Sequence, residues 1–183
     1  MIDEILGDAK ERMEKAVEHV QNEFGTVRTG RANPGILHRV SVEYYGSPTP
    51  LQQLASFAVP EPTMLVVTPF DPGALGEIER AISSAGLGLM PANDGNVIRL
   101  SFPPLTEERR KELVKVVNHM AEEGKVAIRN IRRPHKDDLE ALKGELSDDD
   151  IRRAEKDLQS MTDAFVVRVD ELFEHKQTEL LEV

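Results

Sequence analysis

The chain has 183 residues, a formal net charge of −10 and no cysteine. Its length allows one or two domains with a hydrophobic core, and the lack of cysteine excludes disulfides, zinc–thiolate sites and cysteine nucleophiles. Aromatic residues make up only 4 %, without tryptophan, which disfavours base stacking as the main way of binding nucleic acid. No apolar run approaches the roughly 20 residues that span a bilayer, and the acidic N-terminus is unlike a signal peptide. We therefore expect a cytoplasmic protein.

Residues 2–27 are predicted to form one long helix. Apolar residues recur there at intervals of four and three, from Ile2 to Val27, with Phe24 taking the place of Glu23 in the rhythm. This heptad pattern is typical of a helix that packs along others in a bundle or coiled coil. Gly30 and Pro34 break the pattern and end the helix.

Residues 31–104 carry the signals of a small α/β domain, mostly β. Alternating or continuous apolar residues predict strands over 40–44, 57–59 and 64–68, and residues 46–50 read as a turn. A short helix is predicted over 74–85 because apolar residues lie on one face and a glycine follows. The segment 93–96, Asn-Asp-Gly-Asn, predicts a hairpin between strands at 87–90 and 97–102.

Two further long helices are predicted after this domain, over 107 to about 144 and 148 to about 181. Thr106 is placed to cap the first of them, with Glu107 and Glu108 in its first turn. Pro134 lies inside that helix, where a proline removes one hydrogen bond and costs about 3 kcal/mol. The sequence therefore predicts either a kink near Ile131 to Pro134 or two abutting helices.

Three long amphipathic helices with apolar seams predict an α+β protein in which a three-helix bundle carries an inserted domain. The bundle comprises residues 1–30 and 105–183, and the inserted α/β domain comprises residues 31–104. Two short connections near 28–31 and 103–106 join them. Paired linkers of this kind form a hinge, and the expected hinge residues are Thr29, Gly30, Arg31, Pro103, Pro104, Leu105 and Thr106.

The most unusual stretch is Lys125–Lys136, in which five of twelve residues are cationic and none is acidic. On a helix, four of these cations fall within roughly 60° of arc: Lys125, Arg129, Arg132 and Lys136, flanked by Arg133. The apolar stripe expected for the same helix lies roughly 130° away and consists of Leu113, Met120, Ala127 and Ile131. The cations either pair with acidic neighbours or form a phosphate-binding ridge. The arginines favour the ridge, because the planar guanidinium suits phosphate.

No catalytic constellation is evident. The five histidines do not share a metal-ligand spacing, and no phosphate-binding loop, dinucleotide fingerprint or nucleophile motif occurs. We expect His119 and His135 on the flanks of the long helix. The prediction is a protein without enzymatic activity, cofactor or metal.

Four motifs resemble the ribosome recycling factor family, in order and over essentially the whole chain. They are Arg-Thr-Gly-Arg-Ala-Asn-Pro at 28–34, Tyr-Tyr-Gly-Ser-Pro-Thr-Pro-Leu at 44–51, Leu-Thr-Glu-Glu-Arg-Arg-Lys-Glu-Leu at 105–113 and Val-Ala-Ile-Arg-Asn-Ile-Arg-Arg at 126–133. The resemblance implies an L-shaped pair of domains that mimics tRNA. It also implies a monomeric translation factor that, with elongation factor G, splits the post-termination 70S ribosome and releases it from mRNA.

The resemblance further implies that elongation factor G, and not this chain, hydrolyses GTP. Binding would be to the 23S rRNA of the large subunit, through the residues Arg132, Arg129, Arg28, Arg133, Arg31 and Lys125. Two alternatives remain open from the residues alone. One is a helical RNA-binding or coiled-coil adaptor whose basic stripe meets an acidic protein, and the other is an enzyme with an active site in the α/β domain.

Overall fold

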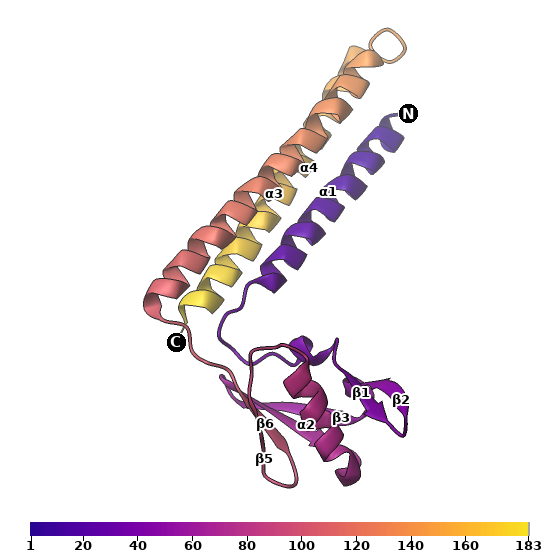
Figure 1. Cartoon of the computed structure of the whole chain (residues 1–183). Helices are drawn as coiled ribbons and strands as arrows, with labels where there is room; N and C mark the ends of the chain where they lie inside the picture. Colours follow the sequence, from indigo (N-terminus) through magenta and orange to yellow (C-terminus); the bar gives the residue numbers. More distant parts are fainter. Residues whose placement is uncertain (183) are drawn as a thin grey trace. The chain divides into compact units, whose positions relative to one another are not determined.

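The structure is a computed structural model that describes residues 1–182, and the chain divides into two compact units. The helical unit comprises Met1–Thr29 and Thr106–Val183, and the inserted unit comprises Gly30–Leu105 (Figure 1). The backbone therefore passes from one unit to the other twice.

Three long helices make up the helical unit and lie side by side in Figure 1: α1 (Ile2–Thr26), α3 (Glu107–Ala141) and α4 (Asp148–Leu181). Each of them packs against both others. The bundle core consists of Ala9, Met13, Val17, Val20 and Phe24 of α1, Val117, Ala121, Gly124, Ile128, His135 and Leu139 of α3, and Ile151, Ala154, Leu158, Thr162, Phe165, Val169 and Leu180 of α4. The predicted three-helix bundle is confirmed.

Side-chain caps fix where α3 and α4 begin. Thr106 Oγ1 accepts a hydrogen bond from the backbone N–H of Arg109 at 3.1 Å, as its predicted capping role requires. Ser147 Oγ accepts one from the N–H of Asp150, also at 3.1 Å. Acidic residues occupy the first turn of both helices, where they interact favourably with the helix dipole.

The buried face of α3 differs from the predicted stripe. Ala127 is exposed, and Leu113, Met120 and Ile131 are only partly buried. The core side instead runs through Gly124, where α3 approaches α1 so closely that an added Cβ would lie 2.3 Å from Val20 Cγ2. Gly124 and His135 share this buried side with Val117, Ala121, Ile128 and Leu139. Because glycine and histidine give no apolar signal, the sequence pattern predicts a different face.

Pro134 does not divide α3, which is one helix from Glu107 to Ala141. The alternative of two abutting helices is therefore wrong. Pro134 has no N–H to offer the carbonyl of Asn130. Both residues are exposed, so water can satisfy that carbonyl and the helix can continue.

The inserted unit contains a four-stranded antiparallel sheet in the order β3-β4-β6-β5 and a separate hairpin, β1-β2. The strands are β1 (Ser41–Tyr44), β2 (Ser47–Pro50), β3 (Ala55–Glu61), β4 (Met64–Pro69), β5 (Pro91–Asn93) and β6 (Ile98–Ser101). Helix α2 (Leu75–Ser84) and three 3-10 turns (Pro34–Leu37, Leu51–Gln53 and Pro72–Ala74) complete the unit. Its core joins alternate residues of β4 and β6 to Ile78 and Ile82 of α2.

Two strands lie elsewhere than predicted. Residues 47–50 form β2 rather than a turn, and the loop before it is only Tyr45-Gly46, both with positive φ. Pro48 and Pro50 are tolerated because β2 pairs only with β1. Prolines can occupy the positions of such an edge strand whose N–H would point away from the partner strand. No strand forms at the predicted position 87–90; the strand that pairs with β6 is β5, which begins at Pro91.

The loop between β5 and β6 yields a prediction about acid stability. Asp94 Oδ1 accepts hydrogen bonds from the N–H groups of Val97 and Asn96, both at 2.9 Å, and Arg99 pairs with Oδ2. These hydrogen bonds lower the pKa of Asp94 from 3.8 to about 2, and the two from backbone N–H groups have the largest effect. Because the pKa of Asp94 is lower in the folded chain than in the unfolded chain, the ionised carboxylate stabilises the fold at pH values above the unfolded pKa. This stabilisation is lost as pH falls through about 2.

We therefore expect Asp94→Asn to reduce the free energy of unfolding at neutral pH. The difference from the parent chain should shrink as pH falls from about 4 to about 2. Urea titrations across this range measure it. A difference that stays constant with pH would contradict the assignment.

Candidate nucleic-acid interface

The exposed arginines of α3 form the centre of the site. Arg129 and Arg133 are exposed, and within residues 1–182 no hydrogen bond or ion pair engages either side chain. Arg132 lies between them, half-buried against α4. We call these three residues the ridge. Helical spacing places them on neighbouring turns, so their charges act on one strip of surface.

Arg132 is held by a short chain of polar groups from α4. Its Nη1 donates to Gln159 Oε1, and Gln159 Nε2 donates in turn to Asp163 Oδ1 at 2.8 Å. The Arg132 Nε is buried and has no hydrogen-bond partner among the described residues. Gln159 and Asp163 were not predicted as site residues, although their spacing of four on a helix signals an interacting pair. They pre-orient the guanidinium.

Lys125 is placed differently from the ridge. Its side chain is only 14 % exposed, and its Nζ lies 2.7 Å from Glu122 Oε1 and 2.8 Å from Asp170 Oδ1 of α4. Hydrogen bonds to Asp170 and then to Glu122 raise the pKa of Lys125. Lys125 therefore links α3 to α4 through its ion pair with Asp170 and does not belong to the ridge.

Lys125→Ala tests this assignment. We expect it to lower the free energy of unfolding by about 0.2–1 kcal/mol, the usual range for ion pairs with exposed partners, with little change in affinity for RNA. Adding Asp170→Asn to Lys125→Ala should cost less than Asp170→Asn alone. A loss of affinity for RNA as large as that of Arg129→Ala would return Lys125 to the ridge.

The second predicted set of cations lies at the unit boundary. Arg28 belongs to the helical unit and Arg31 to the inserted unit, and both interact with other groups of the chain. Between them, Gly30 has φ +75°, and an added Cβ would lie 3.2 Å from Leu105 Cγ. A side chain at position 30 would therefore be disfavoured both by the positive φ and by the nearby Leu105.

Lys136 also belongs to the predicted cationic stripe of α3. Its Nζ lies 3.4 Å from Glu140 Oε1 on the same helix.

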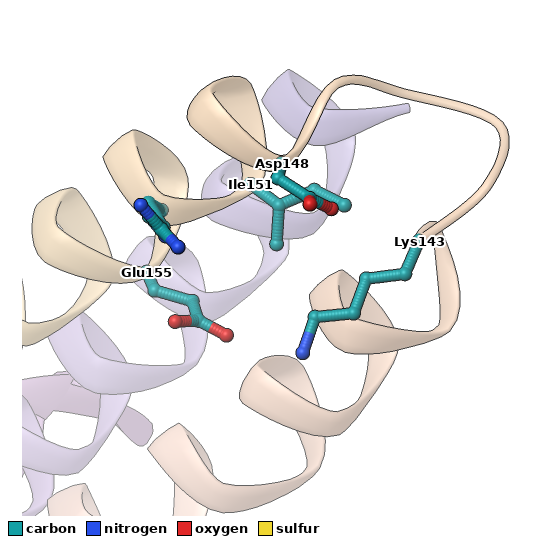
Figure 2. Close-up of a pocket in the computed structure, with 5 residues that line it drawn as sticks. Lys143, Asp148, Ile151 and Glu155 are labelled. Atoms are coloured by element: carbon teal, nitrogen blue, oxygen red, sulfur yellow. The ribbon is translucent and has the colours of Figure 1, made fainter.

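A cavity of about 320 Å³ lies where α3 turns into α4, lined by Lys143, Asp148, Ile151, Arg152 and Glu155. Figure 2 shows side chains of α4 and the Lys143 side chain bordering this opening. Two cations and two acids balance each other, so the cavity has no net attraction for a polyanion. It is not part of the interface.

Three further features concern metal binding, membrane helices and His135. Among residues 1–182 no group of three or more histidine, aspartate or glutamate side chains is placed to hold a metal ion. In the same part of the chain, no helix is long and apolar enough to cross a membrane. His135 is not on the flank of α3, because its side chain is buried in the bundle.

Comparison with known proteins decides the family. The family model of ribosome recycling factor matches residues 20–181. The chain belongs to the ribosome recycling factor family. It is 53 % identical to the ribosome-recycling factor of Bacillus subtilis and 55 % identical to that of Pseudarthrobacter chlorophenolicus, each over 100 % of both chains.

Solved structures agree with this family. A solution structure of ribosome recycling factor is 41 % identical, with a TM-score of 0.79, and covers 100 % of this chain and 98 % of its own. A second structure contains the T. thermophilus ribosome recycling factor and E. coli elongation factor G bound to the E. coli post-termination complex. That match is 45 % identical over 100 % of both chains, with a TM-score of 0.65. The predicted α+β fold is confirmed.

Family membership also removes two alternatives. Ribosome recycling factors are non-enzymatic translation factors, so an active site in the inserted unit is no longer required. A generic coiled-coil adaptor would not explain a match that covers the inserted unit as well as the bundle.

Proposed function

We propose that this protein recycles the ribosome after termination, acting with elongation factor G to separate the subunits and free them from mRNA. One observation carries the proposal: the full-length similarity to a chain of the structure with elongation factor G and a post-termination complex. Elongation factor G supplies GTP hydrolysis, in keeping with the lack of a phosphate-binding loop in this sequence.

The ridge is the proposed grip on the large subunit. Arg129 and Arg133 offer exposed guanidinium groups, and Arg132 offers one held in place by Gln159. Guanidinium forms charge-assisted, often bidentate hydrogen bonds with phosphate, so this strip suits the backbone of 23S rRNA. The strongly acidic remainder of the chain is repelled by RNA and thereby favours one binding orientation.

Helix α3 and the segments between the two units would transmit force. Helix α3, with 35 residues, is about 50 Å long at 1.5 Å per residue, and it packs against both α1 and α4. We assign the boundary segments Thr29–Arg31 and Pro103–Thr106 as a hinge that lets elongation factor G push the inserted unit. Arg28 and Arg31 would contact rRNA beside this hinge.

A splitting assay tests the proposal. Post-termination 70S complexes are mixed with this protein, elongation factor G and GTP, and light scattering follows dissociation. Scattering should fall only when both factors and GTP are present. Undiminished scattering with all components, under conditions where a curated family member splits the same complexes, would overturn the proposal.

A further inference from the structure

His135 is a buried histidine inside the bundle, one residue beyond Pro134. Its side chain is 5 % exposed and makes two contacts of 2.7 Å. Nδ1 faces the backbone carbonyl oxygen of Ile131 on its own helix, and Nε2 faces Asp8 Oδ2 on α1. Both ring nitrogens therefore point at oxygen acceptors.

These contacts determine the charge of the ring. The carbonyl of Ile131 can only accept, so Nδ1 carries a proton. Asp8 Oδ2 also accepts from Arg12 Nε at 2.9 Å, and the hydrogen bond with His135, followed by that with Arg12, lowers the pKa of Asp8. Asp8 Oδ2 already accepts from Arg12, so its contact with the ring is a hydrogen bond when Nε2 carries a proton as well. The imidazolium is the form in which both contacts are hydrogen bonds.

The contacts of His135 lie on the turn of α3 that Pro134 weakens. Pro134 leaves the carbonyl of Asn130 without its helical donor. The ring of His135 donates to the next carbonyl, that of Ile131, and so adds a bond across the same turn. Its other bond anchors the turn to α1, while Arg132 anchors it to α4 through Gln159.

We propose that Asp8 and His135 form a charged clamp that braces the proline-containing turn of α3 and holds the ridge arginines in position. The contacts of His135 with Ile131 and Asp8 are enough to support the bracing of the helix. The effect of this bracing on RNA binding rests on the proposed function. His135 thereby acts as a positioning residue and does not itself contact RNA.

The charged surroundings of the ring come chiefly from α1. Asp8 is its ionic partner, and Arg12 shares the same carboxylate oxygen. On α3 the nearest charges in sequence are Lys136, one residue away, and Arg133 and Asp137, two residues away, and among residues 1–182 none of these three makes an ion pair with the ring. From α4, no hydrogen bond or ion pair reaches the ring within residues 1–182. The Asp8 carboxylate therefore carries the stabilisation of the imidazolium.

The first test reads the ring directly. Nitrogen NMR of the full-length protein at neutral pH should show both nitrogens of His135 protonated, and Asp8→Asn should convert the ring to a neutral tautomer. One unprotonated ring nitrogen in the parent protein at neutral pH would overturn the charged clamp.

The second test measures whether the clamp acts on the proline turn. In the parent chain, Asp8→Asn should raise the unfolding equilibrium constant roughly tenfold or more, the usual effect of losing a hydrogen bond to a charged group. In the Pro134→Ala background, which regains the backbone N–H, the same change should have a clearly smaller effect. Equal effects in the two backgrounds would show that the pair merely joins α1 to α3.

Binding to isolated large ribosomal subunits tests the consequence. Asp8→Asn should weaken binding several-fold, and adding Pro134→Ala should restore it. Unchanged binding by Asp8→Asn, with Arg132→Ala clearly impaired, would overturn the positioning role and leave the proposed function intact. Unchanged binding by Arg132→Ala would instead overturn the ridge as the RNA contact.

Discussion

Replacing Arg129 and Arg132 together by alanine is expected to weaken binding to isolated large ribosomal subunits by about 100-fold or more. A hydrogen bond to a charged group contributes about 1.5–3 kcal/mol, so each arginine accounts for at least about tenfold. Arg129 is exposed and Arg132 is already oriented by Gln159, so neither needs a large rearrangement to meet a phosphate. Competition binding with labelled parent protein measures the loss.

The matched control removes the same charge elsewhere. Lys10→Ala with Lys15→Ala takes two exposed cations from α1 and alters net charge equally, but should leave affinity within about threefold, because long-range charge effects are screened at physiological salt. Equal losses in the two double variants would mean that net charge, rather than the ridge, governs binding.

Gly124→Ala is expected to lower the free energy of unfolding of the bundle, although replacing a glycine inside a helix by alanine usually raises it. The new methyl would lie 2.3 Å from Val20 Cγ2, and overpacking of this kind costs about 1–3 kcal/mol. Valine in a helix has one preferred χ1 rotamer and cannot easily turn aside. Urea titration should show a lower midpoint.

Two further variants make this prediction sharp. In a Val20→Ala background the clashing methyl is gone, and the Val20 Cβ is 3.6 Å from the new Cβ, so Gly124→Ala should be neutral or stabilising there. Gly7→Ala on α1, with no atom within 4 Å of the added Cβ, should stabilise by up to about 1 kcal/mol. If Gly124→Ala behaves like Gly7→Ala, the close approach of α1 and α3 is wrong.

Strong periodicity and capping made most of the fold predictable. The three long helices were placed from apolar spacing, and the Thr106 cap from its position before two acids and an amphipathic run. What failed depended on tertiary contacts. The seam of α3 passes through Gly124 and His135, whose residue types give no apolar signal, and β2 was missed because Pro48 and Pro50 conceal an edge strand.

The candidate site was predictable to a similar degree. Helical spacing identified Arg129, Arg132 and Arg133 as neighbours, and the structure places the first and third of them on the exposed surface. Spacing could not reveal that Lys125 turns toward Asp170 or that Gln159 holds Arg132, because these partners lie on another helix.

The salt dependence of binding to large ribosomal subunits tests the ridge most directly. Each phosphate contact releases counterions, so the logarithm of the affinity should fall linearly with the logarithm of salt concentration, by roughly 0.7–0.9 per contact. We expect a steep slope for the parent protein and a slope shallower by about one contact for Arg132→Ala. Binding that is tight but insensitive to salt, with the same slope in both proteins, would contradict an RNA-binding ridge.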